Sequence, residues 1–161
     1  MRCNMPAVLI VAHAPLASAL KAVAAHVYAD CGHPVAALDV PQNADVDAVV
    51  ALAKDLIDRE SETEWLVLTD VFGATPCNAM TQLAEAAPPA RHLRVVAGVN
   101  VPMLWRTLCY ADEPLDRLTA RALAGAQQGT VIAAPATEPL PAAPAAREPT
   151  VRDQDDHHHP Q

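Results

Sequence analysis

The chain has 161 residues, of which 52% are hydrophobic and only 3% aromatic. Its 19 acidic and 11 basic side chains give a formal net charge of −8, which argues against binding to nucleic-acid phosphates. No apolar run reaches the roughly 18 residues that a membrane span needs, and the four cysteines form no CxxC pair. These features predict a cytoplasmic α/β protein with reduced thiols.

Short apolar runs alternate with segments of helical periodicity from residue 7 to residue 134. The uninterrupted run at 7–12 predicts a strand buried on both faces, and the spacing of apolar residues over 16–29 predicts a helix. By the same criteria, strands are expected at 34–40, 65–69, 93–97 and 130–134, and helices at 46–59, 75–86, 101–110 and 115–126.

This alternation predicts a doubly wound, mainly parallel sheet with helices on both faces and strand order 2-1-3-4. The short strand at 130–134 is expected at an edge of the sheet. Composition changes at residue 135, after which the chain is rich in Pro and Ala and carries an acidic cluster. We expect residues 1–134 to form the domain and 135–161 to be a disordered tail, because such a segment cannot bury enough apolar surface to fold.

Polar side chains stand at the ends of the first and third predicted strands. In an open α/β sheet the binding crevice lies at the carboxyl ends of the strands, where the strand order reverses. His13 and Asp70 occupy these two ends and should face each other. An imidazole that donates one N–H to a carboxylate keeps its other nitrogen nucleophilic, so the pair is a candidate nucleophile and orienting group.

The segment after Asp70 has the features of an anion-binding turn. Gly73 permits a tight turn, Thr75 is a good N-cap, and Pro76 suits the first helical position. The free N–H groups at the start of the following helix would then point into the crevice. A second loop, containing Asn100, follows the fourth strand and is expected to wall the same site.

Three blocks of sequence carry a resemblance to a known family. They are residues 8–13 (VLIVAH), 68–78 (LTDVFGATPCN) and 97–104 (AGVNVPML). In this order and spacing they resemble the enzyme IIA component of the mannose class (mannose, fructose and sorbose) of the bacterial phosphoenolpyruvate-dependent sugar phosphotransferase system, or PTS. The resemblance covers about residues 7–134.

The resemblance implies a phosphocarrier. His13 would accept a phosphoryl group on Nε2 from phospho-HPr and pass it to a IIB protein, with Asp70 as its hydrogen-bond partner. The chain would form a homodimer that exchanges the strand at 130–134, would need no metal or organic cofactor, and would reach the membrane only through IIC and IID components. The implied phosphoryl-binding residues are Gly73, Ala74, Thr75, Asn78 and Asn100.

The chain departs from the family pattern beside both site residues. Ala12, Ala14 and Pro15 surround His13 where Thr and Gly are usual, and Ala74 replaces a second Gly. Three alternatives remain open: a regulatory module that reports phosphorylation state without sugar transport, the phosphotransfer subunit of a dihydroxyacetone kinase, and an α/β domain in which His13 and Asp70 are only a structural pair. The block at 97–104 argues against the kinase subunit.

Overall fold

The computed structural model describes residues 5–27, 33 and 35–133. The chain divides into two units, Met1–Val131 and Ile132–Gln161, and the described helices and strands all lie in the first. The predicted tail at 135–161 lies outside the described residues. So do residues 28–29 and 34, which the predicted first helix and second strand included.

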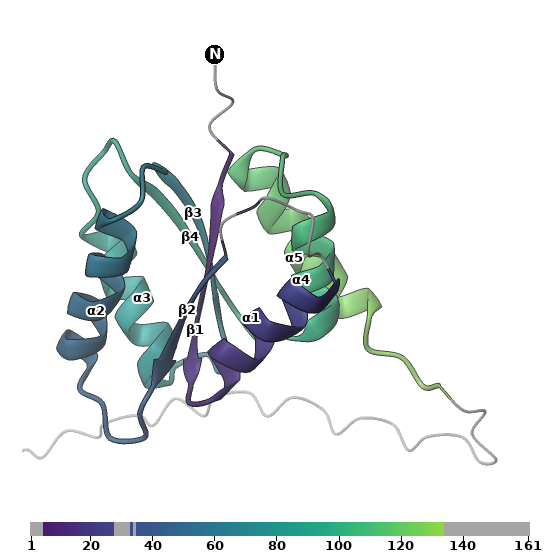
Figure 1. Ribbon diagram of the computed structural model, residues 1–161, viewed down its shortest axis with the longest axis horizontal. Helices are drawn as coiled ribbons and strands as arrows, with labels where there is room; N and C mark the ends of the chain where they lie inside the picture. The colour runs from purple at the N-terminus through teal and green to yellow at the C-terminus, as the bar shows by residue number, and fades with distance from the viewer. Residues whose placement is uncertain (1–4, 28–32, 34, 134–161) are drawn as a thin grey trace, which may run out of the picture. The chain divides into compact units, whose positions relative to one another are not determined.

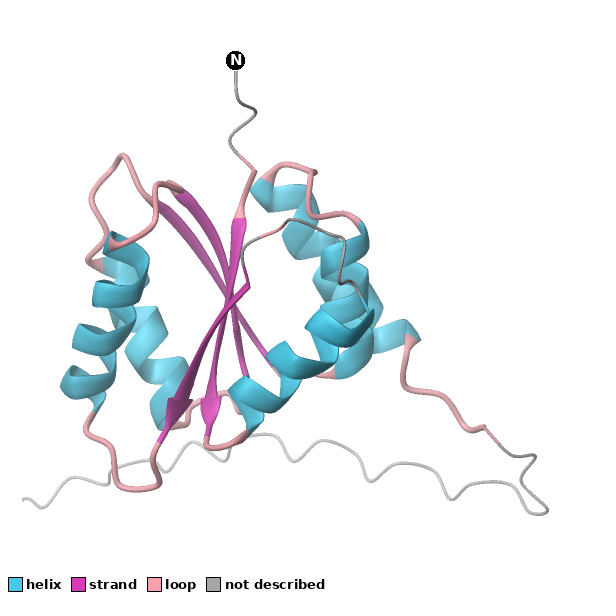
Figure 2. Cartoon of the chain, viewed as in Figure 1, coloured by secondary structure: helices cyan, strands magenta, loops and turns pink. Residues whose placement is uncertain are grey.

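A four-stranded parallel sheet forms the centre of the first unit. Its strands are β1 (Ala7–His13), β2 (Val35–Val40), β3 (Glu64–Thr69) and β4 (His92–Ala97), in the order β2-β1-β3-β4. The arrowheads in Figures 1 and 2 therefore point to one edge, the lower one in both views. The predicted fold class and strand order are confirmed.

Five helices of the described part of the chain cover the two faces of the sheet. One face carries α1 (Leu16–Val27), α4 (Val101–Cys109) and α5 (Leu115–Gln128), and the other carries α2 (Val46–Asp58) and α3 (Thr75–Glu85) (Figure 1). All five predicted helices are present, with small shifts at their ends. Helices α1 to α4 each follow a strand, so they all begin at the carboxyl edge of the sheet.

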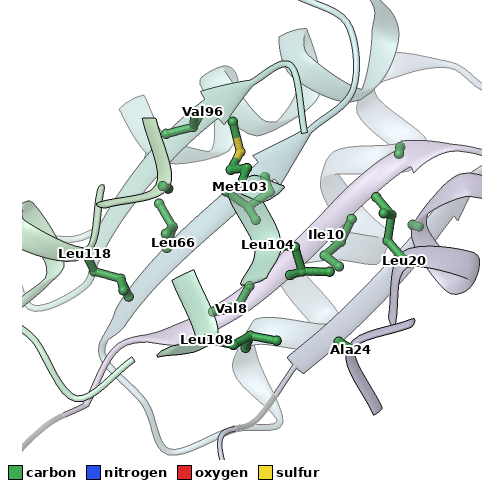
Figure 3. Packing of buried hydrophobic residues seen from close by; sticks show 14 of the residues in the cluster. Val8, Ile10, Leu20, Ala24, Leu66, Val96, Met103, Leu104, Leu108 and Leu118 are labelled. Carbon is green, nitrogen blue, oxygen red and sulfur yellow. The ribbon is translucent and has the colours of Figure 1, made fainter. Parts of the chain in front are cut away.

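The side chains of β1 alternate between two apolar cores, as they must in a strand covered on both faces. Val8 and Ile10 pack against Leu104 of α4 on one face (Figure 3), whereas Leu9 and Val11 pack toward α2 and α3 on the other. The β1 residues Ala7–Ala12 are fully buried. Because β1 is packed on both faces, it is held in place along its length, and its last residue, His13, has a fixed position.

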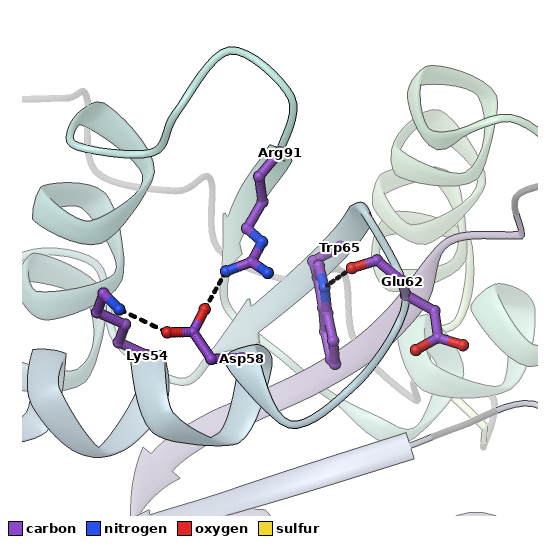
Figure 4. A network of polar contacts seen from close by, with 5 residues as sticks. All are labelled: Lys54, Asp58, Glu62, Trp65 and Arg91. Carbon is purple, nitrogen blue, oxygen red and sulfur yellow. Dashed lines mark hydrogen bonds and ion pairs between the residues drawn. The ribbon is translucent and has the colours of Figure 1, made fainter.

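At the opposite, amino edge, polar contacts join α2 to the segment before β4 and tie the start of β3 to the segment that precedes it. The Asp58 carboxylate pairs with Lys54 on its own helix and with Arg91 before β4 (Figure 4). Hydrogen bonds from these two cations hold the pKa of Asp58 below its ordinary value. Nearby, the buried Trp65 ring donates Nε1–H to the Glu62 carbonyl at 3.1 Å. These contacts stabilise the scaffold away from the strand ends.

Helices α4 and α5 approach each other closely at a glycine. A Cβ atom at Gly125 would lie 2.6 Å from Cβ of Arg106 and 2.8 Å from the carbonyl oxygen of Pro102. Real Cβ atoms do not come that close, so glycine is required for this helix packing.

The predicted strand at 130–134 is not found in its described part. Residues 130–133 belong to no strand, Ala134 lies outside the described residues, and Val131 and Ile132 are largely exposed. These residues pair with no strand of the described sheet, so exchange of this segment between two chains stays a prediction. Among the described helices, none is both long and apolar enough to cross a membrane.

Candidate functional site

His13 and Asp70 meet at the carboxyl edge of the sheet, as the strand ends predict. The Nδ1 atom of His13 lies 2.7 Å from Oδ2 of Asp70, and the backbone N–H of His13 donates to the same oxygen at 2.9 Å. An ionised carboxylate only accepts hydrogen bonds, so the proton lies on Nδ1 and the lone pair on Nε2. The His13 side chain is 43% exposed and that of Asp70 only 9%, which leaves the ring accessible from outside.

The pKa of Asp70 lies below its ordinary value. Burial by itself raises this pKa, but three hydrogen bonds to the carboxylate outweigh burial: two from His13 and one from the Val71 backbone N–H at 2.8 Å. The carboxylate is thus held in its charged form. A negative charge against Nδ1–H stabilises the positive charge that develops on the ring when Nε2 forms a bond.

The turn between β3 and α3 is shaped by Gly73 and Asn78. Gly73 has a φ of 79°, a left-handed conformation that other residues adopt only with strain, although a Cβ would meet no atom there. The Asn78 side chain donates Nδ2–H to the Gly73 carbonyl at 2.9 Å, and the Ala74 backbone N–H donates to Val71 at 3.2 Å. The predicted site residues of this segment therefore form one closed turn.

The N-cap of α3 lies one residue before the predicted one, although the helix begins at Thr75 as its predicted range does. Ala74, not Thr75, is the N-cap, and its carbonyl accepts the first helical hydrogen bond from Asn78 at 2.9 Å. Pro76 therefore stands at the second helical position rather than the first. Because alanine has no side-chain acceptor, no side chain caps this helix.

The loop after β4 is tied to the loop after β3. The Gly98 N–H donates to the Asp70 carbonyl and the Val99 N–H to the Thr69 carbonyl, both at 2.9 Å. Asn100 caps α4, because its Oδ1 accepts the Met103 N–H at 2.8 Å. The side-chain oxygen of Asn100 is thus engaged by its own helix, and its role in the site stays a prediction.

The four helices that begin at this edge differ in how their first turns are satisfied. Helix α4 has the Asn100 cap, and α1 is capped by Asp39 of β2, whose Oδ1 accepts the Ser18 N–H at 3.1 Å. Helix α2 has no side-chain cap but carries Asp47 in its first turn, which repels anions. Among the described helices at this edge, only α3 has neither a side-chain cap nor an acid in its first turn. Its N–H groups and positive helix end are therefore the ones suited to an anion.

The sequence did not indicate that Asp39 caps a helix, because this residue lies within an apolar run that is typical of a strand. Its carboxylate caps a helix that lies 21 residues earlier in the chain, and only the pairing of Ala12 with Asp39 across β1 and β2 brings the two together.

Exposed apolar side chains lie close in sequence to His13 and Asp70. Phe72 is 87% exposed, and Val71 and Leu16 are also exposed. The segments that follow the four strands, residues 14–18, 41–48, 70–78 and 98–104, contain no Lys or Arg. The segments that follow the strands therefore carry exposed apolar side chains and no basic residue. Within residues 5–27, 33 and 35–133, no group of three His, Cys, Asp or Glu side chains could hold a metal ion.

Comparisons with known proteins identify the family of this chain. The family described as PTS system fructose IIA component (EIIA-man) matches residues 7–127. The mannose-specific EIIAB component of the PTS of Escherichia coli K12 is 36% identical over 87 residues, which cover 52% of this chain. The match covers 26% of that relative, so the chain spans about a quarter of its length.

Solved structures show the same fold. The mannose/sorbose-specific IIA subunit of Enterococcus faecalis superposes with a TM-score of 0.69 at 26% identity, covering 83% of this chain and 99% of that one. The EIIA component from Streptococcus agalactiae gives a TM-score of 0.67 at 25% identity, covering 80% of this chain and 97% of that one. The chain therefore belongs to the mannose-class IIA family of the bacterial phosphotransferase system.

Proposed function

We propose that the chain is a phosphocarrier that accepts a phosphoryl group on Nε2 of His13 from phospho-HPr and passes it to a IIB protein. The contact between His13 Nδ1 and Asp70 at 2.7 Å carries this proposal, because it leaves Nε2 as the exposed nucleophile.

The proposed transfer needs little covalent chemistry from the protein. The Nε2 lone pair attacks phosphorus in line with the N–P bond of the donor's phosphohistidine, and that bond breaks as the new one forms. The donor ring takes back its electron pair and leaves as imidazole. His13 keeps its Nδ1 proton, and Asp70 balances the positive charge that the ring gains.

We assign the phosphoryl oxygens to the start of α3, which follows Asp70 directly. Gly73 and Thr75 would offer backbone N–H donors, whereas Ala74, Asn78 and Asn100 would shape the two loops around the group. The absence of an acid and of a side-chain cap from this first turn supports the assignment.

The loops around His13 contain no Lys or Arg, so we propose that the partner supplies the cation that balances the phosphoryl charge. A partner with a basic, partly apolar face, such as phospho-HPr, would also match Val71 and Phe72. A cytoplasmic chain of this kind would act on the membrane-bound IIC and IID components only through IIB.

We also propose a homodimer in which each chain adds its segment around Val131 and Ile132 to an edge of the partner's sheet. In one chain these two apolar residues are largely exposed and belong to no strand. Pairing with a sheet edge would satisfy their backbone groups and cover their side chains.

Incubation with phosphoenolpyruvate, enzyme I and HPr tests the carrier function. We expect one phosphoryl group per chain by intact mass, no incorporation without HPr, and loss of the group when a IIB protein of the same system is added. A folded chain that takes up no phosphoryl group from phospho-HPr would contradict the proposal.

A further inference from the structure

The loop that carries His13 is held from both neighbouring strands. On the β3 side, Asp70 accepts the His13 backbone N–H at 2.9 Å. On the β2 side, the Ala14 N–H donates to the Val40 carbonyl at 3.0 Å, next to Asp39. Only Ala14 and Pro15 separate His13 from the first residue of α1.

Asp39 fixes the start of α1 to β2. Its Oδ1 accepts the Ser18 N–H at 3.1 Å, and the Ser18 hydroxyl in turn donates to the Pro15 carbonyl at 3.0 Å. An N-cap acceptor usually comes from the residue that precedes the helix. Here that residue is Pro15, which has no side-chain acceptor, and the acceptor comes from a neighbouring strand instead. Hydrogen bonding to Ser18 keeps the pKa of Asp39 below its ordinary value, so the carboxylate is charged near neutral pH.

We propose that Asp39 is a positioning residue for phosphoryl transfer, which fixes the path of the His13 loop by capping α1 from β2. This inference rests on the proposed function of His13. A shift of α1 reaches His13 through only two residues, and a misplacement of about 1 Å can cost up to about 100-fold in rate. Because Asp39 already accepts a hydrogen bond in the first turn of α1, that turn is not open to the phosphoryl group, whereas the first turn of α3 is.

Three variants test this role with phospho-HPr as donor. Asp39→Ala removes the acceptor, and Asp39→Val removes it with a side chain that suits an edge strand. Asp39→Asn keeps an oxygen that can accept the Ser18 N–H. We expect kcat to fall about tenfold in the Ala and Val variants, with KM within about twofold of wild type. The Asp39→Asn variant should keep at least about half of the wild-type kcat. Asp47→Ala is the matched control, because Asp47 lies at the same edge of the sheet but hydrogen-bonds Gln82 at 3.1 Å.

The outcomes separate positioning from stability. If Asp39 only stabilised the fold, the Ala and Val variants would melt at lower temperature but show wild-type kcat when folded, and the inference would be wrong. An equal loss in the Asn variant would also contradict it, because the cap would then be irrelevant. If wild type itself takes up no phosphoryl group, the proposed function fails instead.

Discussion

A single carboxylate oxygen, Oδ2 of Asp70, accepts two hydrogen bonds from His13: one from Nδ1 at 2.7 Å and one from the backbone N–H at 2.9 Å. The side-chain hydrogen bond keeps the ring proton on Nδ1 and orients the ring, and the backbone hydrogen bond fixes the position of the residue. Ring and loop are therefore fixed by the same group.

Replacement of Asp70 by Asn should slow phosphoryl transfer to His13 by about 10- to 100-fold, on the scale of the partners that orient a metal-binding histidine through its second ring nitrogen. The amide keeps the shape of the side chain but loses the charge that stabilises the ring cation. Rapid-quench measurement of transfer from phospho-HPr checks this, with Asp47→Asn as a control for the loss of one acid. A rate within twofold of wild type would mean that Asp70 only caps the turn.

Asp70 should also make the free energy of unfolding depend on pH in the acidic range. Its folded pKa is depressed below the ordinary value of 3.8, so its contribution to the free energy of unfolding is fully present above that value. The contribution is lost as the pH falls through the folded pKa. We expect the difference between wild type and Asp70→Asn in urea unfolding to shrink between about pH 5 and pH 2. A difference that stays constant over this range would contradict the depressed pKa.

Gly73 should tolerate Asn better than Ala. Its φ of 79° costs an alanine about 1 to 2 kcal/mol, whereas Asn adopts this conformation more readily, and no atom blocks either side chain. Thermal unfolding of the two variants measures the difference. Equal melting temperatures for Gly73→Ala and wild type would show that the turn relaxes out of this conformation.

Phe72→Ala should raise KM for phospho-HPr about tenfold and change kcat much less, because an 87%-exposed ring beside the site contributes to docking and not to the chain's own packing. Leu52→Ala is the matched control, since Leu52 is an exposed apolar residue of α2. An unchanged KM for Phe72→Ala, or an equal rise for Leu52→Ala, would place the docking contact elsewhere.

The sequence was sufficient to predict the sheet and the meeting of His13 with Asp70. Runs such as residues 7–12 have the pattern of strands covered on both faces, and the ends of adjacent parallel strands must lie side by side. Contacts that depend on register or on the approach of two helices have no such pattern. For this reason the cap from Asp39 and the need for Gly125 became apparent only in the structure.

One prediction was wrong because a local preference did not decide the outcome. Thr75 is a better N-cap than Ala74, yet Thr75 is the first residue of α3 and Ala74 is the N-cap, next to the turn that Asn78 closes onto Gly73. Residues 130–133 have the composition of a strand but form none in the described single chain, so their exchange in a dimer stays a prediction. Hydrogen-bond partners from outside a segment are not visible in its own sequence.

The most direct test of the central claim is to locate the phosphoryl group. After phosphorylation by phosphoenolpyruvate, enzyme I and HPr, we would measure intact mass and acid lability for wild type, His13→Ala and His26→Ala, the last changing an exposed histidine of α1. We predict one acid-labile phosphoryl group on wild type and on His26→Ala, and none on a folded His13→Ala. A phosphoryl group that persists in His13→Ala would contradict His13 as the acceptor.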